Sequence, residues 1–285
     1  MVTAGSDLAA ECNVAEGKGI RVQRATAGGY EILRVRIEGA QAAAQVGKPE
    51  GRYVTLDCGS FCEPKGREEE EICRVLAVEM REMARRMCQR QIGADFAVLV
   101  VGLGNADMTA DALGVQTVRA LSVTRQLQRE ERAMLPGGSI CEISAVAPGV
   151  PGQTGIETAE LVRGAVWSVK PDLVIAVDAL AARTPVRLAA TVQLCDSGIQ
   201  PGSGVGRARR ALTKESLGVP VMAVGVPTVI RCETLIVDAL GEERAAESSL
   251  REDVRRLCVC PGEIDLVVGR AARVLASAIE RAFCT

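Results

Sequence analysis

Continuous runs of apolar residues alternate with helix-patterned segments over most of the chain, and this alternation limits the possible folds most strongly. Examples are the runs at 98–101 and 173–177, which contain only Val, Leu, Ile and Ala. A strand with apolar side chains on both faces has to be covered on both faces, as in a parallel α/β sheet. We therefore expect an α/β fold with a mostly parallel sheet flanked by helices.

Periodicity assigns the individual elements. Strands are expected at 96–101, 143–147, 173–177, 190–195 and 221–225, and helices at 68–91, 112–121, 156–169, 228–240 and 263–283. Partial alternation over 19–39 and a short apolar stretch at 53–56 predict a small N-terminal β extension. Residues 1–19 show no periodicity and are expected to form a mobile leader, whereas 20–285 are expected to form a single domain.

The chain of 285 residues contains no histidine. This absence excludes Ser-His-Asp and Cys-His catalysis and any metal centre that depends on histidine ligands. If the protein is a hydrolase, its acid and base are therefore carboxylates, a lysine or a terminal amine.

Eleven cysteines are present, and in a cytosolic chain such thiols mostly serve as small, reduced core residues. The closest pairs are Cys58 with Cys62 and Cys258 with Cys260. Neither pair has the two-residue spacing of a zinc knuckle, so we expect no metal and no other cofactor.

The net charge of −2 gives no strong attraction to nucleic acid or to a membrane surface. No apolar run reaches the roughly 18 residues that a membrane-spanning helix needs. The N-terminus has no basic region followed by an apolar one, so it does not predict a secretory signal, and a cytosolic location is expected.

Two aspartates come directly after or soon after expected strands. Asp178 follows the strand at 173–177, and Asp111 follows the turn at 102–105. Parallel sheets place their sites at the carboxyl ends of strands. Each aspartate could also simply cap a following helix, and Asp196, at the end of 190–195, is a third candidate.

A pair of carboxylates within about 5 Å of each other cannot both ionise easily and shares a proton. One carboxylate then acts as a base toward water and the other as an acid toward a carbonyl group. Such a pair would hydrolyse a peptide bond without histidine, serine or metal.

Two glycine-rich stretches are weaker signals. The glycines at 102 and 104 lack the third glycine of a dinucleotide-binding fingerprint, so a tight turn explains them better. The stretch 202–206, followed by Arg207, suggests either an anion contact or a solvated loop.

Longer motifs carry a resemblance to a known family. They are GRYVTL at 51–56, VVGLGN at 100–105, TADALG at 109–114, APGVPGQTGIET at 147–158, PDLVIAVDALAAR at 171–183, DSGIQPGSGVG at 196–206 and LGVPVMAVGVPTVI at 217–230. With these motifs the chain resembles the germination proteases of spore-forming Firmicutes, endopeptidases that degrade small acid-soluble spore proteins.

The resemblance implies an atypical aspartic protease whose α/β fold is similar to that of hydrogenase-maturation proteases. It implies that Asp111 and Asp178 form the catalytic dyad. It further implies a homotetramer acting in the forespore or spore core. Because the substrates carry acidic residues around the cut, Arg183 and the glycine-rich loop with Gly204 and Arg207 are candidate substrate contacts.

The resemblance also gives the leader a role, because germination proteases are made as zymogens that remove their own N-terminus. Their cleavage motif is an acidic residue, an apolar residue, Ala, any residue and then Glu, and residues 7–11 (DLAAE) match it. We therefore expect self-cleavage between Asp7 and Leu8, which would release a propeptide of residues 1–7.

Two other interpretations remain open at this point. One is a maturation-type protease that depends on a bound metal, as the similar fold would allow. The other is a sporulation protein that keeps the fold and binds a partner without cleaving it.

Overall fold

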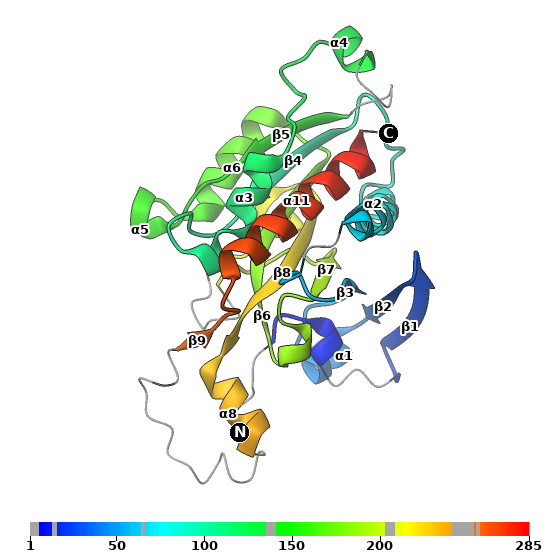
Figure 1. Cartoon of the computed structure of the whole chain (residues 1–285). Helices are drawn as coiled ribbons and strands as arrows, with labels where there is room; N and C mark the ends of the chain where they lie inside the picture. Colours follow the sequence, from blue (N-terminus) through cyan, green and yellow to red (C-terminus); the bar gives the residue numbers. More distant parts are fainter. Residues whose placement is uncertain are drawn as a thin grey trace.

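The computed structural model describes residues 6–12, 16–63, 66–134, 141–202, 209–240, 254 and 257–284. Nine strands of these residues form one sheet with helices on both faces (Figure 1). The predicted α/β class is therefore confirmed. None of the helices in the described part of the chain is both long and apolar enough to cross a membrane.

The sheet has a parallel half and an antiparallel half. Its strand order is β1-β2-β3-β7-β8-β6-β4-β5, and β9 adds to β8. The parallel half consists of β5 (Glu142–Val146), β4 (Ala97–Gly102), β6 (Leu173–Ala182) and β8 (Val221–Arg231). The antiparallel half consists of β7 (Thr191–Cys195), β3 (Gly51–Asp57), β2 (Tyr30–Ile37) and β1 (Ile20–Ala27), and β9 (Cys258–Val259) also pairs antiparallel with β8.

Helices cover the sheet on two sides. Alternate side chains of the central strands pack with α2 (Arg67–Cys88), α3 (Leu113–Ala120) and α11 (Ile264–Phe283), seen in cyan, green and red in Figure 1. The remaining side chains of these strands pack with α6 (Thr158–Val169) and α7 (Lys214–Leu217). On that same face, α1 (Ala40–Val46) covers the antiparallel half.

The predicted strand at 190–195 exists, but it runs against the parallel strands. Residues 183–190 connect it to β6, and they form a loop with a single 3-10 turn at Pro185–Arg187. A parallel return needs a crossover of a dozen or more residues, usually with a helix. The short connection therefore turns β7 antiparallel, and the sheet is less parallel than its apolar runs suggest.

Two strands extend further than their apolar runs predicted. β6 continues to Ala182 and β8 to Arg231, so the expected helix at 228–240 begins only with α8 (Cys232–Leu240). β-branched residues at 226 and 228–230 favour an extended backbone, which explains the longer β8. Asp178 consequently lies within a strand and caps no helix.

The leader differs from the predicted mobile segment over residues 6–12. Leu8 and Ala9 are fully buried, and Ala9–Glu11 form a short 3-10 helix, η1. Two apolar side chains removed from water explain why this segment is held in place.

Candidate active site

Asp178 lies on β6 just beyond the point where the neighbouring strand β4 ends. Val177 still pairs with Gly102, the last residue of β4, whereas Asp178 pairs with Gly225 of β8. The side chain is only 6% exposed, and its Oδ1 accepts a hydrogen bond of 3.0 Å from the N–H of Ala179. The end of a neighbouring strand thus leaves space beside a buried carboxyl group.

Asp111 is positioned by the turn that follows β4. Its Oδ2 accepts a 2.8 Å hydrogen bond from the N–H of Asn105, and it ends the 3-10 helix η2 (Thr109–Asp111). Gly104 has a φ of +104°, and a side chain there would overlap the main-chain carbonyl of Asp111. Only glycine allows the loop to fold back so closely.

Two further contacts fix Asp111 relative to Asp178. The hydroxyl of Thr228, on β8, donates a 2.6 Å hydrogen bond to the carbonyl of Ala110. Gly114, at the start of α3, lies directly against the carbonyl of Val177, where a Cβ atom would overlap it. The turn and the helix are therefore pressed against the strand segment that carries Asp178.

The surroundings oppose ionisation of both carboxyl groups. Burial raises the pKa of Asp111, although the Asn105 N–H partly offsets this. Burial raises the pKa of Asp178 well above its ordinary value, and the charges of Asp111 and Asp7 raise it further. The close approach of Gly114 and the Thr228 hydrogen bond thus bring the turn of Asp111 to the strand that carries Asp178.

The leader is hydrogen-bonded to the strand that carries Asp178. The N–H of Asp7 donates to the carbonyl of Ala181, and the N–H of Ala181 donates to Oδ2 of Asp7, both at 2.9 Å. On the other side, the Gln193 side chain of β7 donates a 2.9 Å hydrogen bond to the carbonyl of Asp7 and accepts a 2.7 Å hydrogen bond from the N–H of Ala9. The Asp7–Leu8 peptide bond is therefore held between two strands of the sheet.

The apolar side chains of the leader lie in two separate surroundings. Leu8 packs among Leu180, Ala182 and Ile230 at the extended ends of β6 and β8. Ala9 packs against apolar residues of the antiparallel half of the sheet.

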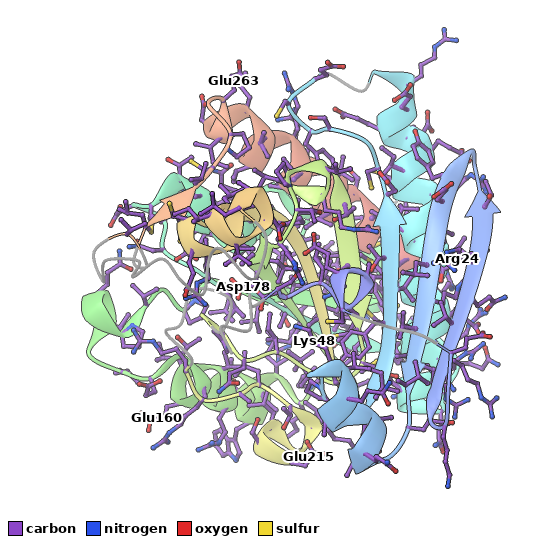
Figure 2. The ribbon with its side chains drawn as sticks, turned by 90° about the horizontal axis from the view of Figure 1, so that it is seen from below. Arg24, Lys48, Glu160, Asp178, Glu215 and Glu263 are labelled. Carbon is purple, nitrogen blue, oxygen red and sulfur yellow. The ribbon has the colours of Figure 1, made fainter. Side chains whose placement is uncertain are left out.

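Hydrogen-bond donors surround the Glu11 side chain of the leader. The Glu11 carboxylate accepts hydrogen bonds from the N–H of Arg183 at 2.6 Å, and from the N–H and hydroxyl of Thr184 at 2.9 and 2.7 Å. At the other end of the segment, Lys48 donates to the carbonyl of Ser6 at 2.6 Å. Figure 2 shows Asp178 and Lys48 near the centre of the molecule.

The remaining candidates lie elsewhere. Because β7 is antiparallel, its end carries Asp196 away from the Asp178 row, and Asp196 accepts a 2.7 Å hydrogen bond from the N–H of Arg52 instead. The guanidinium of Arg183 pairs with Asp238 at 3.4 Å, and its main-chain N–H donates to the leader carboxylate. Gly204 and Arg207 lie outside the described residues.

All eleven cysteines are free thiols. Cys58, Cys73, Cys141 and Cys195 are buried, as expected for small core residues, whereas Cys258 and Cys260 are exposed. Over the part of the chain that the structure describes, no group of three or more Cys, Asp or Glu side chains is arranged to hold a metal ion.

Sequence reasoning missed two residues of this site, Gln193 and Thr184. Gln193 is the amide side chain within TVQLC, an otherwise mostly apolar strand, and a polar residue in a buried strand was a usable signal. Thr184 gave no such signal, since a threonine in a loop after a strand is common.

Comparisons with known proteins give consistent results. A family model described as germination protease matches residues 2–242. A germination protease of Caldanaerobacter subterraneus subsp. tengcongensis is 40% identical over 291 residues, covering 93% of this chain and 88% of the relative. One from Clostridium acetobutylicum is 35% identical, covering 96% and 93%.

The Bacillus subtilis germination protease is 42% identical over 227 residues, which span 79% of this chain and 60% of the longer relative. Among solved structures, a NiFe hydrogenase maturation protease from Thermococcus kodakarensis matches with a TM-score of 0.34 and 17% identity, over 66% of this chain and 94% of that one.

Proposed function

The chain belongs to the germination protease family, and from this premise we propose that it is an endopeptidase that uses Asp111 and Asp178 as an aspartate dyad. Family membership makes it a protease and therefore a hydrolase. The observation that carries the dyad is geometric: Gly114 and Thr228 hold the turn of Asp111 against the strand segment that carries the buried Asp178.

The proposed chemistry needs one ionised and one protonated carboxyl group. The ionised carboxylate takes a proton from a water molecule, and the oxygen of that water attacks the carbonyl carbon of the peptide bond. The protonated carboxyl donates its proton to the nitrogen as the C–N bond breaks. The products are a new carboxyl group and a new amine. Coupled carboxylates titrate as a pair, so the acid and base roles belong to the dyad and are not assigned to single residues.

We further propose that the protein is made as a self-processing zymogen cleaved between Asp7 and Leu8. Hydrogen bonds to Ala181 and Gln193 on either side of this bond support the assignment. Cleavage would release residues 1–7 as the propeptide. Arg183, Gly204 and Arg207 stay candidate substrate contacts.

Small acid-soluble spore proteins are the proposed substrates, and the forespore or spore core is the proposed location. The leader supports this substrate class, because its apolar Leu8, small Ala9 and acidic Glu11 each meet matching surroundings. A homo-oligomer, a tetramer by resemblance, is the proposed assembly. No nucleic-acid or membrane partner is proposed.

The decisive experiment is the intact mass of the full chain before and after incubation at mildly acidic pH. We expect the wild type and an Asp196→Asn control to lose residues 1–7, and Asp111→Asn and Asp178→Asn to keep them. Cleavage by either dyad variant at the wild-type rate would contradict the proposed dyad.

The same assay separates the two other interpretations. A metal-dependent protease would stop cleaving in the presence of EDTA, whereas the proposed dyad would be unaffected. A protein that only binds a partner would cleave neither itself nor a small acid-soluble spore protein.

A further inference from the structure

Gln193 lies in the same row of the sheet as Asp178. Asp178 of β6 pairs with Gly225 of β8, and Gly225 pairs with Gln193 of β7. Residues paired directly across neighbouring strands point to the same face, so the carboxyl and the carboxamide face the same side. Gly225 between them has no side chain, and the position that a Cβ atom would take lies against Leu180 and the carbonyl of Asp178.

The carboxamide of Gln193 is 6% exposed, and the leader satisfies both of its polar atoms. Its Nε2 donates to the carbonyl of Asp7 at 2.9 Å, and its Oε1 accepts from the N–H of Ala9 at 2.7 Å. These two groups lie on either side of Leu8, and a neighbouring β-strand would form hydrogen bonds with the same two groups. Because both are main-chain groups, any extended peptide could supply them.

The carbonyl that Gln193 bonds belongs to the Asp7–Leu8 peptide bond. When water attacks this carbon, negative charge develops on the Asp7 oxygen. A preorganised N–H donor aimed at that oxygen in a water-poor site stabilises the transition state more than the ground state.

Resting on the proposed function, we propose that Gln193 is a catalytic residue of the cleavage reaction. Its Nε2–H bonds the carbonyl oxygen of the peptide bond that is cut, and its Oε1 fixes the peptide on the other side of the cut. Its ligand is therefore the main chain of an extended peptide, and side-chain preference comes from the surroundings of Leu8, Ala9 and Glu11.

Two substitutions in the full chain test this role. Gln193→Met removes both polar atoms, and we expect the first-order rate of self-cleavage to fall by about 10²- to 10³-fold, as for other carbonyl-oxygen donors. Gln193→Glu keeps the shape. Its ionised carboxylate has no proton to donate, whereas the protonated form donates an O–H, so its rate relative to wild type should rise as the pH falls.

Matched controls separate catalysis from folding and docking. Gln126→Met and Gln126→Glu change an exposed glutamine outside the site and should cleave at the wild-type rate. Hydrogen exchange of the Ala181 amide, which is bonded to Asp7, shows whether the leader stays docked in each variant.

The possible outcomes are distinguishable. A Gln193→Met chain with a docked leader and a rate within threefold of wild type would overturn the inference. If the leader of that variant is no longer docked, the test rests on Gln193→Glu. A cleavage rate of Gln193→Glu relative to wild type that does not change with pH would contradict a donor role. A wild type that does not cleave would instead overturn the proposed function itself.

Discussion

At the residue scale, the burial that makes Asp178 a candidate for acid–base chemistry also has a cost in stability. Burial, together with the charges of Asp111 and Asp7, raises the pKa of Asp178 in the folded protein, so folding disfavours its ionised form. Its contribution to stability is fully present below the pKa of the unfolded chain. It is lost as the pH rises through the raised pKa of the folded state.

Asp178→Asn is therefore expected to stabilise the protein at pH 7. The wild type loses about 1.4 kcal/mol of its free energy of unfolding for each unit by which the pKa of Asp178 is raised. Asparagine cannot ionise, so the variant does not have this loss. The advantage should vanish near pH 4 and below, where the wild-type group is protonated in both states. Urea unfolding from pH 4 to pH 8 measures the difference.

The control is Asp95→Asn, which changes a side chain that is 67% exposed and pairs only loosely with Arg129 at 3.2 Å. We expect less than about 0.5 kcal/mol from this surface change. A gain for Asp178→Asn that is the same at pH 4 and pH 8 would show that folding does not raise the pKa of Asp178.

At the element scale, the proposed dyad depends on how closely α3 approaches β6. Gly114 lies against the carbonyl of Val177 and the main chain of Leu103, leaving no room for a Cβ atom. The helix start and the turn before it, which carries Asp111, can reach the strand only because position 114 has no side chain.

Gly114→Ala is expected to destabilise the fold and to displace Asp111 from Asp178. Backbone atoms on two sides must move, so we expect a loss of about 1–3 kcal/mol, typical of overpacking, together with slower self-cleavage. Thermal unfolding measures the loss of stability, and intact mass measures the rate of self-cleavage.

Gly164→Ala is the matched control, because Gly164 lies within α6 with nothing near the position of a Cβ atom. There the change should raise stability by about 0.5–1 kcal/mol, since alanine favours a helix. Equal effects at both glycines would refute the importance of the close approach.

The leader is a second element whose position affects the site. The Glu11 carboxylate is bonded to two main-chain N–H groups and to the Thr184 hydroxyl. Glu11→Gln replaces a charged acceptor by a neutral amide, which weakens these bonds. Hydrogen bonds to charged groups contribute about 1.5–3 kcal/mol, so the amides of Arg183 and Thr184 should exchange faster.

Hydrogen exchange measured residue by residue checks this expectation. Glu16→Gln, at an exposed position after the docked segment, is the control and should leave those amides protected. Unchanged protection in Glu11→Gln would show that the carboxylate does not hold the leader.

At the scale of the whole molecule, α11 joins regions that are far apart in the sequence. It packs against α2, against α3 and against the central strands, and its Phe283 stacks on Phe96 with ring centroids 6.1 Å apart. The last helix thus completes a core to which helices and strands from most of the chain contribute.

Leu275→Ala is expected to cost about 2–5 kcal/mol, because Leu275 is fully buried at the centre of this contact. Leu266→Ala, on the same helix but 47% exposed, should cost much less. Denaturant unfolding followed by circular dichroism compares the two. Similar losses would mean that α11 does not complete a shared core.

The sequence alone determined the elements that periodicity encodes. The strands β4, β5, β6 and β8 and the helices α2, α3, α6 and α11 begin within a few residues of their predicted starts. Local patterning records which side chains are buried, and burial on both faces is enough to predict parallel strands with helical cover. Their position after such strands also made Asp111 and Asp178 candidates, whereas their pairing as a dyad came from the family resemblance and stays a proposal.

Only the tertiary structure decided the place of the leader and its contacts with Gln193 and Thr184. These features depend on contacts between segments more than a hundred residues apart, such as Asp7 with Gln193, and no local pattern records them. The apolar surroundings of Leu8 come from the ends of β6 and β8, which exist as a surface only after the sheet has formed. Residues 6–12 therefore read as an aperiodic leader in the sequence, yet they are packed against the sheet in the folded protein.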